Sequence, residues 1–329
     1  MQVQFFARKH YNSKWKYGDK IGHLKASKNG PAANVRWTFQ AERKFFLTTY
    51  IPHLCNLQMN AKPFSTSLVI ATYNWPQALE LCLLSVLKQK QLPDEIVIAD
   101  DGSRQDTRDL VDQFRVRFSI PLQHVWHPDE GFKLAQIRNK ANAAAKGDYL
   151  VQVDGDLILH PHFIKDHIAA AKQGHFIGGS RVILSKELSE KIFREKNTAL
   201  SLFQKGISNH FNGIHSTLVG GLLSSIISTK NAFNIRGCNM SYWKKDFLAV
   251  NGYNELYNGW GREDTDLVFR FYHSGLQRTY FKLRGVVYHL WHKEADRSGL
   301  TQNDTILEQT IQTRATRCEL GSDQYVVGG

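Results

Sequence analysis

The sequence lacks a long apolar run. Its longest, from Thr217 to Ile227, is interrupted by serine and glycine and is shorter than the about 20 apolar residues that a membrane-spanning helix needs. The N-terminus also lacks an apolar core followed by a small-residue cleavage site, which a signal peptide would have. We therefore predict neither a transmembrane helix nor secretion by a signal peptide.

Cysteine is scarce, and its spacing fits no metal site. The four cysteines lie far apart in the chain, at Cys55, Cys82, Cys238 and Cys318. Structural zinc sites usually contain closely spaced cysteine pairs. A few scattered cysteines are instead typical of a protein in a reducing compartment. We therefore predict a cytoplasmic location.

Glycine-rich phosphate-binding motifs are missing as well. The chain contains no P-loop, and no G-x-G-x-x-G follows the first predicted strand. The backbone amides of such a loop would otherwise bind the phosphates of a nucleotide. If this protein binds a nucleotide, we expect a metal ion and a basic side chain to hold its phosphates.

Acidic residues are outnumbered, and the formal net charge is +12. This excess favours an anionic partner, which is nucleic acid, a lipid surface or a phosphorylated small molecule. The sequence shows no zinc pattern, basic helix or aromatic RNA-binding signature, so we predict no nucleic-acid partner. Much of the excess lies in residues 1–60, which show no clear periodicity. This basic extension either precedes a natural start near Met59 or is an arm that touches a membrane surface.

From Ser65 onward, strand-like and helix-like patterns alternate. The runs "TSLVIATYN", "DEIVIADDGS", "LQHVW" and "YLVQVD" predict buried strands, and amphipathic segments between them predict helices. This alternation indicates an α/β fold with a parallel sheet covered by helices. Ligands of such sheets bind outside the carboxyl ends of the strands. Here those ends carry polar residues, namely Thr72, Tyr73, Asn74, Asp100, Asp101, Asp154 and Asp156.

Two of these carboxylates, Asp154 and Asp156, are separated by a single glycine. A carboxylate at the end of a buried strand is costly to desolvate unless a positive charge pairs with it. Mg²⁺ or Mn²⁺ would supply that charge and keep coordination positions open for phosphate oxygens. From these residues alone, the alternative is that both aspartates cap a turn.

Several motifs in order resemble those of a known family. The segments from Leu68 to Thr107 and from Gly131 to Asp156 resemble the nucleotide-binding half of the family-two inverting glycosyltransferases with the GT-A fold, which is Rossmann-like. The segment from Asn234 to Gly275 contains W-G-R-E-D and resembles the acceptor side of galactosyltransferase-type and chondroitin-synthase-type enzymes. The resemblance covers about Ser65 to His292. It implies a nucleotide-sugar-binding half over 61–185, an acceptor-binding and catalytic half over 186–300, and a C-terminal helix and tail over 301–329.

The resemblance also implies roles for individual residues of the first half. It assigns Ala71, Thr72 and Tyr73 to the nucleotide edge, and Asp101 to the base. A guanidinium at Arg138 would contact the diphosphate, because it can donate to two phosphate oxygens at once. The alternative for Arg138 is a charge on the surface of a helix. Asp154 and Asp156 are implied to bind the nucleotide sugar and the metal.

In the second half, inverting transfer needs a carboxylate base that faces the donor sugar. The resemblance implies Asp264 as this base, Glu263 as a ligand of sugar hydroxyls, and Trp260 with Gly261 as an acceptor platform. The alternative for the two acids is a helix cap, and a helix N-terminus would keep them ionised. After the predicted strand "VVY", His289 or His292 would complete the metal site, and imidazole beside carboxylates favours Mn²⁺ over Mg²⁺.

The function implied is a metal-dependent inverting glycosyltransferase that acts at the cytoplasmic side of the membrane. It would move a sugar from a nucleotide diphosphate donor, a UDP-sugar, to a saccharide or lipid-linked saccharide in surface polysaccharide or lipopolysaccharide synthesis. The alternative is a catalytically inactive nucleotide-sugar or carbohydrate-binding module. Residues 199–234 are predicted to form an acceptor lid or a surface-binding segment, with Gly220 and Gly221 as a hinge or a helix-packing face.

Overall fold

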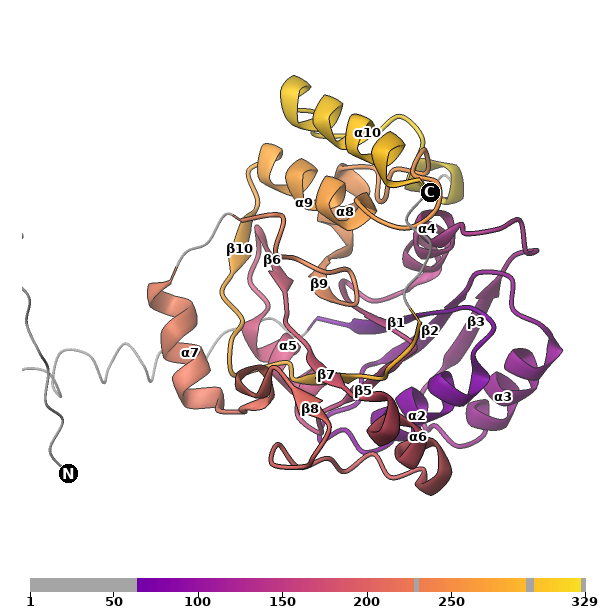
Figure 1. Ribbon diagram of the computed structural model, residues 1–329. Helices are drawn as coiled ribbons and strands as arrows, with labels where there is room; N and C mark the ends of the chain where they lie inside the picture. The colour runs from indigo at the N-terminus through magenta and orange to yellow at the C-terminus, as the bar shows by residue number, and fades with distance from the viewer. Residues whose placement is uncertain (1–63, 228–230, 294–298, 327–329) are drawn as a thin grey trace, which may run out of the picture. The chain divides into compact units, whose positions relative to one another are not determined.

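A seven-stranded sheet lies at the centre of the structure, a computed structural model that describes residues 64–227, 231–293 and 299–326 (Figure 1). The predicted basic extension over 1–60 and the start near Met59 lie outside the described residues. The strands run in the order β10-β6-β9-β4-β1-β2-β3. Their bounds are Gln277–Thr279 for β10, His175–Gly178 for β6, Asn239–Trp243 for β9, Tyr149–Asp154 for β4, Thr66–Thr72 for β1, Glu95–Asp100 for β2 and Leu122–Trp126 for β3.

The sheet is mostly parallel, as the sequence predicts. Strands β4, β1, β2 and β3 pair in parallel, and β9 alone runs in the opposite direction, between β4 and β6. The register places Ala71 opposite Asp154, and Thr72 opposite Asp100. The carboxyl ends of three strands are therefore level at one edge of the sheet.

Alternate residues of the strands pack on opposite faces. Leu68 and Ile70 contribute to one buried cluster, whereas Val69 and Ala71 contribute to the other. The first face is covered by α2 (Pro76–Val86), α3 (Gln105–Arg115) and α5 (Phe163–Ala170), and the second by α4 (Leu134–Ala144), α8 (Lys244–Ala249) and α9 (Glu263–His273). A strand covered on both faces needs a continuous apolar run, which explains why these strands were readable from the sequence.

A second, four-stranded sheet brings the C-terminal part of the chain back to the first half. Its order is β5-β11-β7-β8, with the bounds Leu157–Leu159, Val287–His289, Val182–Leu184 and Ile207–Ser208. Strand β5 begins directly after Asp156, and β11 pairs with it so that His289 lies opposite Leu157. This pairing carries His289 to the end of β4.

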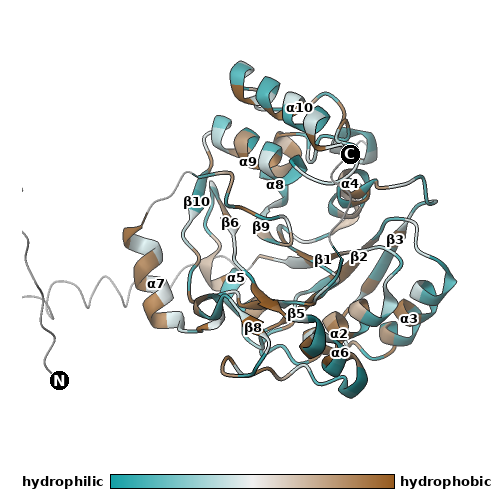
Figure 2. Ribbon diagram, in the orientation of Figure 1, coloured by the Kyte–Doolittle hydropathy of each residue, from teal (hydrophilic) through white to brown (hydrophobic). Residues whose placement is uncertain are grey.

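The remaining elements lie around these sheets. They are α6 (Lys186–Glu195), η1 (His210–Gly213), α7 (Thr217–Ile226), α10 (Leu300–Thr313) and η2 (Ser322–Tyr325). Helix α10 is the predicted C-terminal helix, and it packs on α9, where the Thr310 hydroxyl donates to Asp266 Oδ1 at 2.7 Å. Colouring by hydropathy shows that most outward helix faces are hydrophilic, while α7 is largely apolar (Figure 2).

Candidate functional site

A cavity of about 690 Å³ lies at the carboxyl ends of β1, β2 and β4. Its volume falls in the range of small-molecule sites. The structure brings nine of the predicted site residues to its wall, namely Ala71, Thr72, Tyr73, Asp101, Asp154, Asp156, Trp260, His289 and His292. The other predicted residues, Arg138, Gly261, Glu263 and Asp264, are not among the residues that line it.

The edge of the sheet that is predicted to bind the nucleotide base is held by polar contacts. Asp101 Oδ1 lies 2.7 Å from His127 Nε2, and its Oδ2 accepts from the Lys133 amide at 3.0 Å. Burial raises the pKa of Asp101, although the bond to His127 opposes this. The Tyr73 hydroxyl donates to Asp129 at 2.9 Å, and its side chain is 49% exposed. These bonds fix the aspartate and the tyrosine while the aromatic ring stays accessible for stacking.

Asp156, His289 and His292 form a cluster with the geometry of a metal site. One ligand atom from each lies within 4.8 Å of the others. Asp156 Oδ2 is 3.4 Å from His289 Nε2 and 3.3 Å from His292 Nε2. The position of the loop is set by the Leu290 amide, which donates to the Asp156 carbonyl at 3.0 Å. The sequence predicted that one histidine would be enough, and the structure brings both to the aspartate.

The electrostatics of this cluster fit a divalent cation. Asp156 Oδ1 is buried and has no hydrogen-bond partner. Burial, with the charge of Asp154, raises the pKa of Asp156 to about 7. Burial, with nearby Arg181, lowers the pKa of His289 to about 4, so the imidazole is neutral and able to ligate. One carboxylate and two imidazoles suit Mn²⁺ or a similar metal.

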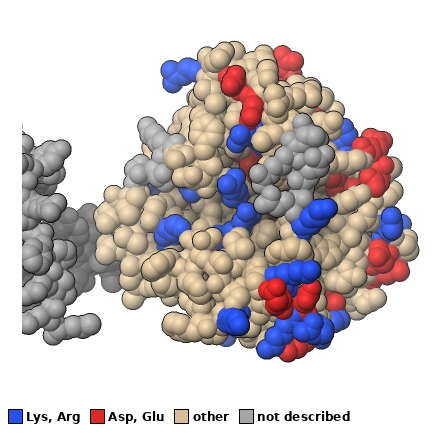
Figure 3. Space-filling view, viewed as in Figure 1, with Lys and Arg blue, Asp and Glu red and all other residues tan. Residues whose placement is uncertain are grey.

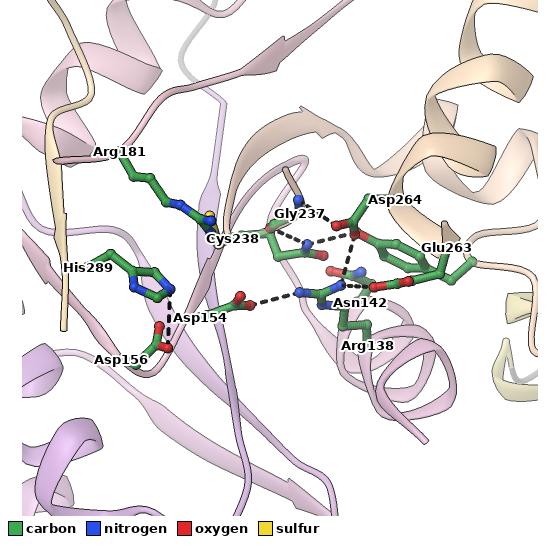
Figure 4. A network of polar contacts seen from close by, with 12 residues as sticks. Arg138, Asn142, Asp154, Asp156, Arg181, Gly237, Cys238, Glu263, Asp264 and His289 are labelled. Atoms are coloured by element: carbon green, nitrogen blue, oxygen red, sulfur yellow. Dashed lines mark hydrogen bonds and ion pairs between the residues drawn. The ribbon is translucent and has the colours of Figure 1, made fainter. Parts of the chain in front are cut away.

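Asp154 lies outside this cluster, and its implied role as a metal ligand stays a prediction. Its Oδ1 accepts from Arg138 at 2.7 Å (Figure 4). The chain turns at Gly155 and Asp156, between β4 and β5, so Asp154 and Asp156 meet different partners. Asp154 nevertheless lines the cavity, with 31% of its side chain exposed.

Arg138 does not line the cavity and is 1% exposed. Its guanidinium donates to Asp154 and, at 3.0 Å, to Asp264, and it lies 3.7 Å from Glu263. The ring of Tyr253 packs against it at 5.3 Å. Three acidic side chains thus surround one buried cation, which contradicts the alternative of a surface charge. The implied diphosphate contact of Arg138 stays a prediction. Arg138 compensates charge that would otherwise destabilise the fold.

Glu263 and Asp264 are the first two residues of α9, directly beside Arg138. Asp264 is held on both oxygens, because Oδ1 accepts from Arg138 and Oδ2 accepts from the Gly237 amide at 2.7 Å. Burial raises the pKa of Asp264 even though Arg138 and the Gly237 amide lower it. Burial, with the charge of Asp264, raises the pKa of Glu263 to about 8. The raised pKa favours the protonated form of Glu263 near neutral pH, against the ionising effect of the helix N-terminus.

Gly237 is a position that sequence reasoning missed. A Cβ added there would lie 2.0 Å from Asp264 Oδ1, so no larger residue fits while Asp264 keeps its place. The chain crosses from the loop into β9 at this point, and Gln152 donates to the Gly237 carbonyl at 2.8 Å. The glycine allows the backbone to approach the carboxylate closely.

Trp260 and Gly261 precede α9 in a loop with left-handed backbone. Gly261 has a φ of 104°, and its carbonyl accepts from Asn303 of α10 at 2.9 Å. Trp260 is 37% exposed and lines the cavity. The structure therefore presents the indole to the cavity and gives the glycine a role in the loop.

Arg181 is the permanent cation of the cavity wall, since no other Lys or Arg lies among its lining residues in the described chain. The guanidinium donates to Cys238 Sγ at 3.7 Å, a weak acceptor (Figure 4). Its charge lowers the pKa of both Asp156 and His289. No motif in the sequence marks this position, so it could not be singled out from the charge alone.

Comparison with protein-family models decides the family. The model "Glycosyl transferase family 2" matches residues 67–232, and "N-terminal domain of galactosyltransferase" matches residues 228–293. This chain belongs to glycosyl transferase family 2. The two matches cover the same two segments for which the motifs predicted a donor half and an acceptor side.

A curated relative of this family 2 member is a chondroitin synthase of Escherichia coli. The two are 26% identical over 223 residues, which cover 64% of this chain and 32% of the relative. The chain spans about a third or less of the length of this and the next curated relatives that it matches.

Two solved structures share its fold. A mannosyltransferase of Pyrobaculum calidifontis in complex with GDP-Man and Mn²⁺ has a TM-score of 0.52 and 14% identity over 84% of this chain and 78% of that one. GalNAc-T7 with UDP, GalNAc and Mn²⁺ has a TM-score of 0.57 and 14% identity over 76% of this chain and 48% of that one. The predicted GT-A fold is confirmed.

None of the helices within 64–227, 231–293 and 299–326 combines the length and the apolar character that spanning a bilayer requires.

Proposed function

We propose that this protein transfers a sugar from a UDP-sugar to a saccharide or lipid-linked saccharide, with inversion and with a divalent cation. The observation that carries this proposal is the single cavity that joins the base-binding edge, the cluster of Asp156 with two histidines, and Trp260. The family match and the nucleotide and Mn²⁺ in the names of the two structural neighbours support it.

The donor would lie along the strand ends. Asp101 would accept from the base, and the exposed ring of Tyr73 would stack on it. Asp156, His289 and His292 would hold the cation, which would bind the diphosphate and stabilise the charge of the leaving group. We further propose that Arg181, not Arg138, donates to the phosphates, because Arg181 lines the cavity and has a weak acceptor as its partner.

Asp264 would act as the base for the acceptor. As the acceptor oxygen forms its bond to the anomeric carbon, the bond from that carbon to the diphosphate breaks, and Asp264 takes the hydroxyl proton. Its raised pKa favours this transfer, and 22% of its side chain is exposed to an approaching acceptor. Protonated Glu263 and the indole of Trp260 would orient sugar rings. Attack from the face opposite the diphosphate gives inversion.

The proposal is tested by measuring UDP release from UDP-sugars with Mn²⁺ and after EDTA, with wild type and Asp156→Asn. We expect EDTA to abolish release, and the variant to lose at least tenfold in Mn²⁺ affinity by calorimetry while its thermal melting changes little. Asp109→Asn, on the outer face of α3, serves as the matched control. Full release in EDTA would refute the metal site, and donor binding without any release would indicate an inactive binding module.

A further inference from the structure

Helix α7 packs on the protein through its small residues. A Cβ added at Gly220 would lie 2.7 Å from the Lys282 carbonyl oxygen and 2.9 Å from Arg284 Cγ. On the same side, Arg284 donates to the Ser224 hydroxyl at 2.9 Å. The glycines predicted as a hinge or a packing face thus serve here as the packing face, which seats the helix against residues 282–284.

The large apolar residues of α7 face outward. Leu218, Leu222 and Ile226 are 88%, 59% and 69% exposed, and their spacing of four places them along one side of the helix. The helix contains no charged residue. A helix that faces water normally shows the opposite arrangement, with its apolar stripe turned toward the core.

Two phenylalanines extend this apolar surface along the neighbouring loops. Phe203 is 97% exposed and Phe211 is 84% exposed. Their loops lie side by side, because His210 Nδ1 is 2.9 Å from the Leu202 carbonyl oxygen. Phe211 lies in η1, shortly before α7 begins. We call Phe203, Phe211, Leu218, Leu222 and Ile226 the α7 surface.

The stretch of chain that carries the α7 surface contains no acidic residue. Between Glu195 and Asp246 the sequence contains six Lys and Arg and no Asp or Glu. Lys205 in this stretch is exposed, and Lys282, whose carbonyl oxygen faces Gly220 of α7, donates through Nζ to Asn212 of η1 at 2.6 Å. The space-filling view shows tan and blue atoms over α7, while the red acidic side chains gather elsewhere on this face (Figure 3).

We propose that the α7 surface inserts into the interfacial region of a membrane that contains anionic phospholipids. Apolar side chains would enter the acyl boundary and the flanking cations would contact the headgroups, the two signals that stable peripheral binding needs. Charge distinguishes this occupant from two others. A second copy of the chain, with a net charge of +12, and the basic residues 1–60 would both bring like charge to this surface. This proposal does not depend on the proposed transfer reaction.

The test uses the full chain in cosedimentation with vesicles of phosphatidylcholine, alone or with phosphatidylglycerol. Wild type should bind the anionic vesicles, and Leu222→Glu and Leu218→Glu should each weaken binding at least tenfold. The control is Val116→Glu, because Val116 is 86% exposed and follows α3, far from α7 in the structure (Figure 1). It introduces the same charge and should leave binding unchanged. Circular dichroism and melting confirm that all variants are folded.

Several results would overturn the proposal. Wild type that binds neither kind of vesicle would refute it directly. Vesicle binding that persists in both leucine variants would assign the membrane contact to another segment, such as residues 1–60. A wild-type dimer that Leu222→Glu converts to a monomer, with unchanged vesicle binding, would assign the α7 surface to self-association.

Discussion

Two groups of carboxylates lie at the same end of the sheet, and they balance their charge in different ways. Asp154, Glu263 and Asp264 surround the buried guanidinium of Arg138. Asp156 instead meets two histidines, of which His289 is neutral at pH 7, and keeps one buried oxygen without a partner. The first group contains its own cation, whereas the second is completed only when a cation binds.

The cation of the Arg138 group is a permanent part of the fold, whereas the cation of the Asp156 group would bind reversibly. Arg138 is linked to α9 across a large gap in sequence, so it joins the two halves of the protein and fixes Asp264. A bound divalent ion can leave with its ligand, and an arginine in the core cannot. We infer that the Arg138 group holds Asp264 in the position that catalysis needs. The Asp156 group, with its bound cation, would neutralise the charge of the diphosphate.

The largest effect is expected from Asp264→Asn. The amide keeps the shape of the side chain but cannot take the acceptor proton, and loss of a general base typically costs on the order of 10² to 10⁴ in rate. Donor affinity should barely change, since Asp264 does not line the cavity. Initial rates and donor-binding calorimetry check this together, with Asp109→Asn as the control. Retained turnover would mean that another residue acts as the general base. A product with the anomeric configuration of the donor, measured by NMR, would refute inversion.

The second effect concerns stability. Arg138→Met leaves the carboxylates of Asp154 and Asp264 without their cation, and breaking such a buried group typically costs about 3–5 kcal/mol in the free energy of unfolding. Urea unfolding measures the change. Arg115→Met is the matched control, because its ion pair with Asp112 is exposed and should contribute less than about 1 kcal/mol. Equal stability of the two variants would show that the carboxylates around Arg138 do not need its charge.

A third effect identifies the carboxylate that holds a proton. The pKa of Glu263 is raised from 4.5 to about 8, so between these values the folded state binds more protons than the unfolded state. Its contribution to stability is therefore lost as pH rises from 4.5 through about 8. Glu263→Gln removes this dependence, and the stability of the variant relative to wild type should increase by on the order of 3 kcal/mol between pH 5 and pH 8. Asp156 gives a slope of the same sign, which cancels in the comparison of the two proteins. Parallel stability curves would mean that Glu263 is ionised.

The Asp156 cluster can be predicted from local sequence patterns, whereas the Arg138 group cannot. The strand ends and the Asp156 cluster depend on local patterns: apolar runs that become buried strands, an aspartate that follows one strand, and two histidines that follow another. The Arg138 group depends on contacts between residues 126 and 16 positions apart, which no local pattern encodes. For the same reason Gly237 and Arg181 gave no signal, because their importance arises only when β9 and β7 approach the cavity.

The smallest effect distinguishes the two arginines as ligands of the donor. Arg181 lines the cavity with a thiol as its acceptor, so its donors are available to a phosphate, whereas Arg138 is already bonded to carboxylates. Arg181→Gln should weaken UDP binding about tenfold, as expected for one charge-assisted contact, and should leave uridine binding unchanged because uridine has no phosphate. Calorimetry with both ligands in Mn²⁺ makes the measurement, and Arg194→Gln, exposed on α6, controls for net charge. An equal loss of affinity for UDP and for uridine would indicate that Arg181 contacts the nucleoside and not the phosphates. An unchanged UDP affinity would show that the cation held by the Asp156 cluster binds the diphosphate without help from Arg181.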